Sequence, residues 1–257
     1  MSPSELAAVI DHTILKPEAS RDDVARVVAE AIEYRFASVC VAPTFVKQVS
    51  AALSGSGVKT CAVIGFPNGT HKPTIKAIEA TSTIKDGADE IDVVAHLPLL
   101  LALDFEAVRD ELMEVVRAAR ATRADVVIKV IIESAALVLI NKERGKERGK
   151  DRAEDRANDR AEETIALACR AVRESGCDFI KTSTGFHPAG GASVQVVRWM
   201  KQYGQSIKVK ASGGIRDLPT AVTMLDAGAD RLGVSASVAI VKTLRGESTT
   251  VAPSSGY

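Results

Sequence analysis

The sequence has no excess charge of either sign and no long apolar run. Lys plus Arg and Asp plus Glu number 33 each among the 257 residues, so the formal net charge is +0. No global field therefore attracts nucleic acid or an anionic membrane, and any anion must be bound by a local site. The longest apolar stretches, such as residues 97–103, fall far short of the roughly 20 residues that cross a bilayer.

The signs of secretion and of metal binding are also missing. The first residues, Met-Ser-Pro-Ser-Glu, do not form the basic segment and apolar stretch of a secretory signal, so we expect a cytoplasmic protein with no membrane partner. The four cysteines include no Cys-x-x-Cys pair and the four histidines stand singly, so we expect no metal. Cys40 and Cys61 lie in short apolar runs, where a small buried side chain is more common than a reactive thiol.

Eight short runs of β-branched and apolar residues alternate with segments of helical periodicity. The runs cover residues 8–12, 37–41, 59–65, 90–95, 126–132, 178–182, 207–211 and 231–235. Most are nearly continuous hydrophobic runs, as in parallel strands covered by helices. Helices are predicted at 21–34, 44–53, 72–86, 104–121, 161–175, 192–203 and 218–227, with a last one from about 235.

These eight units have the size and order of a (β/α)8 TIM barrel. No linker rich in Pro, Gly or Ser divides them, so we predict a single α/β domain over residues 1–257. The alternative fold is a doubly wound sheet. Such a sheet is open and needs no eighth strand, whereas a barrel needs one to close. A flexible tail is expected at about 247–257.

Residues 141–160 interrupt the pattern. Eight basic side chains alternate there with six acidic ones, and Lys-Glu-Arg-Gly occurs twice. Such mixed-charge sequence cannot bury a core face, so we expect a solvated loop or a charged helical extension between the fifth strand and the fifth helix. All candidate catalytic side chains lie outside this insertion, and we expect it to be dispensable for chemistry.

Each of the predicted strands four to seven carries a charged residue in its interior: Asp92, Lys129, Lys181 and Lys210. A single charge of this kind could belong to a structural ion pair. A barrel, however, places neighbouring strands side by side, so their inward side chains converge. We interpret the four residues as one polar site.

Two lysines close together can produce a nucleophile. A protonated amine, with an ordinary pKa of about 10.4, is not nucleophilic at neutral pH, but burial and a second ammonium both favour the neutral form. Lys181 and Lys210 fall on consecutive strands. One can therefore form an imine while the other activates it, and Asp92 is the candidate for moving protons.

Glycines near the last two strands point to a phosphate. Gly213 and Gly214 follow the seventh strand, and Gly233 and Ser235 lie in the eighth run, which leads into a helix. Loops at these places commonly bind phosphate in such barrels, because glycine lets the backbone approach and amides at a helix start donate hydrogen bonds. A tight turn would explain the Gly-Gly pair equally well.

Six motifs together resemble deoxyribose-phosphate aldolase. They begin at residues 11, 63, 87, 129, 178 and 210 and read Asp-His-Thr-Ile-Leu-Lys-Pro, Val-Ile-Gly-Phe-Pro, Gly-Ala-Asp-Glu-Ile-Asp-Val-Val, Lys-Val-Ile-Ile-Glu, Asp-Phe-Ile-Lys-Thr-Ser-Thr-Gly-Phe and Lys-Ala-Ser-Gly-Gly-Ile-Arg. The resemblance implies a cofactor-free class I aldolase of deoxyribose phosphate catabolism. Such an enzyme reversibly splits 2-deoxy-D-ribose 5-phosphate into D-glyceraldehyde 3-phosphate and acetaldehyde.

The resemblance also assigns roles to residues. It implies that Lys181 forms the imine, that Lys210 tunes it and that Asp92 serves the proton relay. Backbone near Gly185, Gly213, Gly214 and Gly233, with Ser235, would hold the substrate phosphate. Accessory candidates are Lys129, Thr13, Cys40 and the terminal Tyr257. A homo-oligomer, either dimer or tetramer, is expected.

Three segments depart from the pattern of the family: the charged insertion and residues 95–98 and 186–191. They bear on substrate preference and turnover more than on reaction type. Three alternatives stay open. The barrel could be a Schiff-base aldolase for another phosphorylated sugar, or it could bind a sugar phosphate without chemistry. In the third, the charged insertion would make the protein a nucleic-acid adaptor, although its acidic residues cancel most of its basic charge.

Overall fold

The computed structural model describes residues 1–146 and 153–247. Eight parallel strands form a closed barrel in chain order, and β8 pairs with β1 to close it. The strands are β1 (Ile10–Thr13), β2 (Ser38–Val41), β3 (Lys59–Ile64), β4 (Glu90–Val94), β5 (Val127–Ile131), β6 (Phe179–Lys181), β7 (Lys208–Ser212) and β8 (Arg231–Val234). All eight predicted runs overlap these strands, so the predicted TIM barrel is confirmed.

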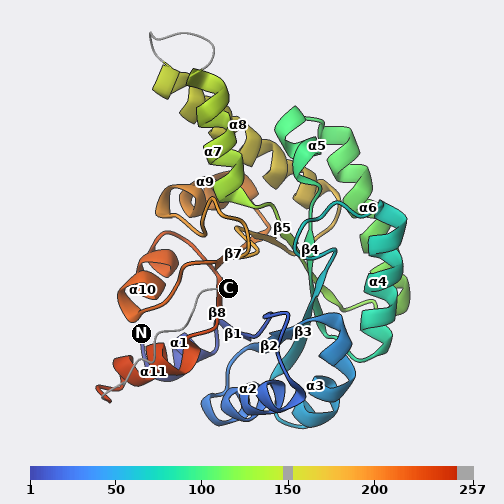
Figure 1. The fold of residues 1–257 in the computed structure, drawn as a ribbon, viewed down its shortest axis with the longest axis vertical. Coiled ribbons are helices and arrows are strands. Elements are labelled where there is room, and N and C mark those ends of the chain that lie inside the picture. The colour runs from blue at the N-terminus through green and yellow to red at the C-terminus, as the bar shows by residue number, and fades with distance from the viewer. Residues whose placement is uncertain (147–152, 248–257) are drawn as a thin grey trace.

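Helices surround the barrel on the outside (Figure 1). Those in the predicted positions are α2 (Arg21–Tyr34), α3 (Val46–Leu53), α4 (Pro73–Lys85), α6 (Phe105–Thr122), α8 (Ala153–Glu174), α9 (Val194–Gly204), α10 (Leu218–Asp226) and α11 (Ser237–Leu244). The sequence does not predict α1 (Pro3–Ala7), α5 (Leu97–Ala102), α7 (Ser134–Lys146) or the short 3-10 turn Pro43–Phe45. These additions lie between the strands of the barrel or before them, so they leave the strand order unchanged.

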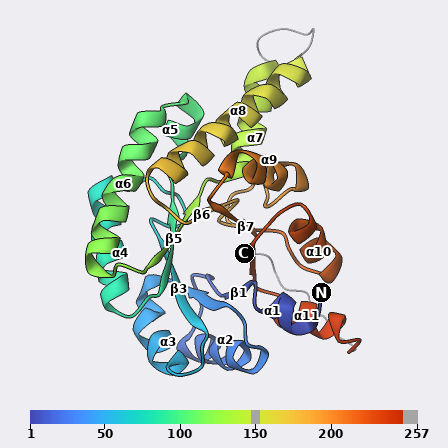
Figure 2. The same cartoon turned by 180° about the vertical axis from the view of Figure 1, so that it is seen from behind.

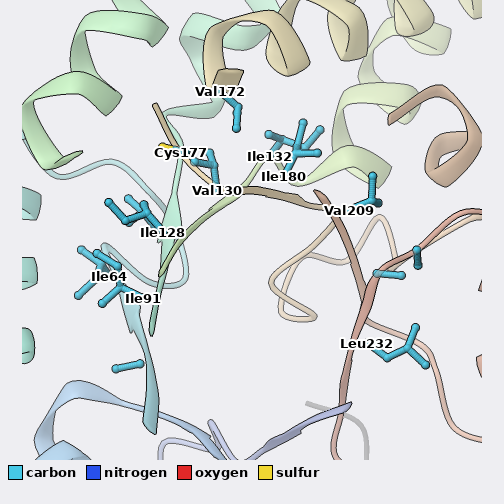
Figure 3. Packing of buried hydrophobic residues seen from close by; sticks show 14 of the residues in the cluster. Ile64, Ile91, Ile128, Val130, Ile132, Val172, Cys177, Ile180, Val209 and Leu232 are labelled. Carbon is cyan, nitrogen blue, oxygen red and sulfur yellow. The ribbon is translucent and has the colours of Figure 1, made fainter. Parts of the chain in front are cut away.

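Alternate residues of each strand face the helices and form the main core. Ile91, Ile128, Ile180 and Val209 are at most 1% exposed and pack in the layer between strands and helices (Figure 3). Because side chains alternate along a strand, their immediate neighbours face the interior of the barrel. The charged residues of β4 to β7 are these neighbours, so the same alternation that builds the core directs the charges inward.

The described part of the charged insertion is helical. It extends α7 to Lys146 and begins again where α8 starts at Ala153, while residues 147–152 lie outside the described chain. The two helices project together from the barrel (Figures 1 and 2). At their base, buried Asn141 donates from Nδ2 to Thr164 Oγ1 at 3.2 Å. Of the two predicted forms, the charged helical extension therefore holds for the described residues.

Two further expectations concern the cellular compartment of the protein. All four cysteines, Cys40 and Cys61 included, are free and buried. Within residues 1–146 and 153–247, no helix combines the length and apolar character needed to cross a membrane. The predicted tail lies outside the described residues from position 248 onward, and Tyr257 with it.

Candidate active site

One carboxylate gathers the charged residues that the sequence places in strands four to seven. Asp92 on β4 is fully buried. Its Oδ2 accepts hydrogen bonds from Lys181 Nζ on β6 and Lys210 Nζ on β7, each at 2.7 Å. Its Oδ1 accepts from Lys129 Nζ on β5 at 2.8 Å. Asp92 thus joins the side-chain amines of three lysines inside the barrel.

A second set of ion pairs surrounds this group, and sequence reasoning missed it. Asp11 Oδ2 on β1 lies 2.5 Å from Lys210 Nζ, and Glu90 Oε2 on β4 lies 2.6 Å from Lys129 Nζ. Arg231 at the start of β8 contacts both acids, with Nη1 2.7 Å from Asp11 Oδ1 and Nη2 3.4 Å from Glu90 Oε1. The available signal was strand alternation, because Glu90 precedes Asp92 by two residues and so shares its face.

The ion pairs set the protonation of these groups. Burial by itself lowers the pKa of Lys129 and of Lys210, but the nearby carboxylates outweigh burial and raise both values above the ordinary range. Burial likewise works to raise the pKa of Asp92, yet the three ammonium groups hold it well below its usual value. Lys129, Lys210 and Asp92 therefore remain charged at neutral pH.

The lysines differ in how many carboxylates they face. Lys129 has three at 2.6 to 3.9 Å, Lys210 has two, and Lys181 has Asp92 as its ion-pair partner in the described chain. With Arg231, four cations face three carboxylates, so the group becomes balanced when one amine is neutral. Lys181 has the fewest carboxylates and is the last residue of β6, at the end of the barrel where substrates enter.

Gly233 makes room for one of these lysines. A Cβ at this position in β8 would lie 3.1 Å from Lys210 Cε and 2.9 Å from Ser212 Cβ. Gly233 therefore lies beside the Lys210 side chain inside the barrel. It is also close to the turn after β8. This use of a glycine depends on a contact between strands, which the sequence does not reveal.

The other predicted phosphate residues lie on three adjoining turns. The turns after β6 and β7 are joined, because Ala192 N donates to the carbonyl oxygens of Ser212 and Gly213 at 3.1 Å. A Cβ on Gly213 (φ +83) would lie 3.5 Å from Gly185 Cα and 2.9 Å from Gly191 Cα. Gly191, which the sequence analysis did not select, thus belongs to the same close backbone contact.

The last turn leads from β8 into α11. Ser235 is exposed, and Ala236 at the N-cap provides no side-chain hydrogen bond to the first amides of the helix. Helix-start amides without a side-chain partner can bind an anion.

Two of the accessory candidates, Thr13 and Cys40, lie on β1 and β2. Thr13 Oγ1 donates to the Asp11 carbonyl at 2.8 Å, a contact within β1. Cys40 on β2 is the register partner of Cys61 on β3, and Cys61 Sγ donates to Asp92 Oδ1 at 3.3 Å.

Cys40, Cys61 and Asp92 are also the one group of metal-type donors in the described chain, with ligand atoms within 4.8 Å of one another. Burial raises the pKa of the Cys61 thiol, and Asp92 already accepts from three ammonium groups. This donor set therefore does not fit a metal cation.

An apolar cluster lines the mouth of the barrel near β1 to β3. Leu15, Cys40, Cys61 and Val63 pack together with Phe66 and Phe186. The Phe66 and Phe186 rings meet edge to face, with centroids 5.1 Å apart. Phe186 is the last residue of the family motif that contains Lys181, so this motif helps to form an apolar wall beside the polar site.

Glu133, two residues after the end of β5, is a buried acid that the sequence analysis did not select. Its backbone has φ +51, a left-handed conformation that is strained for such a side chain. Its Oε2 accepts from Thr184 Oγ1 at 2.5 Å, and Thr184 Oγ1 in turn accepts from Phe186 N at 3.1 Å. Burial raises the pKa of Glu133. The residue thus holds the turn that carries Gly185.

The comparisons with known proteins agree with this geometry. A model of the DeoC/LacD family aldolases matches residues 6–243. Deoxyribose-phosphate aldolase from Mycobacterium tuberculosis is 44% identical over 239 residues, which cover 93% of this chain and 95% of that protein. The enzyme of the same name from Kocuria rhizophila is 43% identical over 242 residues, covering 94% of this chain and 97% of that protein.

A solved structure gives the same result. Deoxyribose phosphate aldolase from Aeropyrum pernix, described as tetrameric, superposes with a TM-score of 0.79 at 33% identity and covers 95% of this chain and 92% of that one. The match therefore extends over the whole barrel in sequence and in structure. The chain belongs to the DeoC/LacD family of aldolases.

Proposed function

We propose that this chain splits 2-deoxy-D-ribose 5-phosphate into D-glyceraldehyde 3-phosphate and acetaldehyde through a Schiff base on Lys181. The activity is that of a deoxyribose-phosphate aldolase, a class I aldehyde-lyase, as in the bacterial relatives that the chain matches over nearly their full length. One observation carries the assignment of the site: Lys181 and Lys210 bond the same oxygen of buried Asp92.

The reaction begins with the amine of Lys181. In its neutral form the amine adds to the C1 aldehyde of the open-chain sugar to give a carbinolamine, which loses water to become an iminium ion. Asp92 lies within hydrogen-bond distance of Nζ, so it can pass the protons that this exchange requires. Lys210 remains protonated and supplies a fixed cation beside the reacting nitrogen.

The bond between C2 and C3 then breaks. The C3 hydroxyl gives up its proton, C3 becomes the aldehyde carbon of glyceraldehyde 3-phosphate, and the electron pair of the bond moves to the iminium nitrogen to form an enamine. Protonation at C2 and hydrolysis of the imine release acetaldehyde and regenerate Lys181. The water lost at the start is recovered at the end, so the reaction needs no cofactor.

The phosphate is assigned to the turns after β6, β7 and β8. Gly185, Gly213 and Gly214 allow close backbone approach, and the start of α11 with Ser235 offers amides. Ser183 supports this placement, because its buried hydroxyl has no hydrogen-bond partner within the described chain and its Cβ lies close to Gly213.

Product analysis tests the function directly. The purified protein is incubated with deoxyribose 5-phosphate and, separately, with a panel of other phosphorylated sugars, and the released aldehydes are identified. Acetaldehyde and glyceraldehyde 3-phosphate are expected, and Lys181→Met should abolish both. The matched control is Lys208→Met on β7, an exposed lysine that should leave the rate unchanged. Faster cleavage of another sugar would show that the assigned substrate is wrong, but it would leave the Schiff-base mechanism unchanged.

We also infer a cytoplasmic location and a homo-oligomer, either dimer or tetramer. Four free, buried cysteines are typical of a reducing compartment. The Aeropyrum pernix relative is tetrameric, and Ile75 and Ile78 are exposed side by side on α4 of this chain. Light scattering coupled to size exclusion measures the mass, and a monomer at micromolar concentration would contradict the inference.

A further inference from the structure

His12 is a buried residue that the reaction described above does not use. It lies on β1 next to Asp11 and is 2% exposed. Its Nε2 lies 2.8 Å from Glu30 Oε2 on α2, and its Nδ1 lies 3.0 Å from Ser237 Oγ, at the first residue of α11. The ring therefore links the second helix of the barrel to the last one.

The Ser237 hydroxyl is shared between two partners. Its Oγ lies 3.0 Å from the Val234 carbonyl oxygen and 3.0 Å from His12 Nδ1. The Glu30 carboxylate accepts, and the hydrogen bond from His12 is the main cause that lowers the pKa of Glu30. His12 Nε2 thus donates to Glu30, while Nδ1 and the Ser237 hydroxyl share a second hydrogen bond.

The contact with Ser237 closes the turn after β8. Val234 is the last residue of β8 and the register partner of His12, and Ser237 bonds both of them. Between the two lie Ser235 and Ala236, the turn to which the substrate phosphate is assigned. His12 and Ser235 line the same cavity, about 430 Å³ in volume. Any shift of Ser237 would move the amides at this turn.

We propose that His12 is a positioning residue for the substrate phosphate, acting through Ser237 on the turn of residues 234–237. The inference rests on the proposed function, because it assumes that the phosphate lies at this turn. A His12 that only fastened α2 to α11 would affect stability alone. A positioning role predicts instead a loss that is confined to substrates with a phosphate.

Two substitutions of His12 separate its contacts. Asn places its amide near the position of Nδ1 and keeps a hydrogen-bond partner for Ser237, whereas Gln places its amide near Nε2 and keeps the donor for Glu30. Ser237→Ala removes the hydroxyl while leaving the ring in place. Glu30→Gln is the matched control, since its amide oxygen can still accept from Nε2.

The test measures kcat and KM for deoxyribose 5-phosphate and for unphosphorylated deoxyribose, with inorganic phosphate as a competitive inhibitor. For His12→Gln and Ser237→Ala we expect KM for the phosphorylated sugar and Ki for phosphate to rise about tenfold. This is the change expected when one hydrogen bond that positions the phosphate-binding turn is lost. We expect kcat, and every constant for unphosphorylated deoxyribose, to stay within about twofold. His12→Asn and Glu30→Gln should behave like the unsubstituted protein.

Three results would overturn the proposal. One is an equal loss on both sugars, which would mean that His12 acts through Asp11 or through the fold as a whole. The second is unchanged Ki for phosphate in folded Ser237→Ala. The third is the same KM increase in His12→Asn as in His12→Gln. If the unsubstituted protein fails to cleave deoxyribose 5-phosphate at all, the proposed function is wrong and this inference falls with it.

Discussion

Replacing Asp92 with Asn should weaken the fold and nearly stop catalysis. The substitution keeps the shape of the side chain but removes the negative charge that three ammonium groups share at 2.7 to 2.8 Å. Four cations, of which the three lysines are buried, would then face only Asp11 and Glu90. Moreover, the new amide group would have to point one or two N–H donors at ammonium groups that are themselves donors.

The expected magnitude follows from the burial of this group. Removing one partner of a buried ion pair costs about 3–5 kcal/mol, because the remaining charge is left without compensation. An ordinary domain is stable by about 5–15 kcal/mol, so the variant should fold with a midpoint of thermal unfolding about 10 °C lower. Loss of the proton relay should reduce kcat by about 10²–10⁴-fold.

Urea unfolding at pH 7 and the rate of deoxyribose 5-phosphate cleavage measure the two effects. Asp89→Asn is the control, since Asp89 is partly exposed, pairs with Arg123 at 2.9 Å and should cost no more than about 1 kcal/mol. Adding Lys129→Met to Asp92→Asn removes one of the cations that are then in excess, so part of the stability should return without any activity. A single Asp92→Asn variant as stable and as active as the Asp89→Asn control would refute the reasoning.

Three further outcomes follow from the same geometry. Gly233→Ala should lower activity about 100-fold with a smaller effect on stability, because its Cβ would displace Lys210; steady-state kinetics on the folded variant checks this. The ion pairs hold the pKa of Asp11 and of Asp92 below the ordinary value, so their contribution to stability should be complete above about pH 5 and be lost as the pH falls below about 4. Urea midpoints at pH 7, 5 and 3 measure this, and a midpoint that rises on acidification would contradict it. Extended dialysis against EDTA should leave the cleavage rate unchanged, and a loss that added metal reverses would show that the Schiff base is not sufficient.

The sequence predicts the barrel well because parallel strands buried on both sides are visible as continuous apolar runs. Charges inside such runs stand out, which is why Asp92 and the three lysines could be identified. Asp11 and Arg231 could not, since they lie near strand ends, where polar residues are ordinary. Helix α7 was missed because its first half is apolar without a clear face; Leu139 there is 44% exposed.

Contacts between segments that are distant in the chain could not be predicted from the sequence. The role of Glu133 depends on Thr184, 51 residues later, and that of Gly233 depends on the path of the Lys210 side chain. Neither is encoded in local periodicity or in residue spacing. The sequence thus identifies which residues carry charge into the barrel, while the structure identifies which carboxylates surround each lysine.

The central claim is that the amine of Lys181 forms the Schiff base, and covalent trapping tests it most directly. The protein is incubated with acetaldehyde, reduced with borohydride, digested and mapped by mass spectrometry. The account predicts a two-carbon addition on Lys181, with Lys129 and Lys210 unmodified because their carboxylate partners keep them protonated. Modification of Lys129 or Lys210 with Lys181 untouched would contradict it.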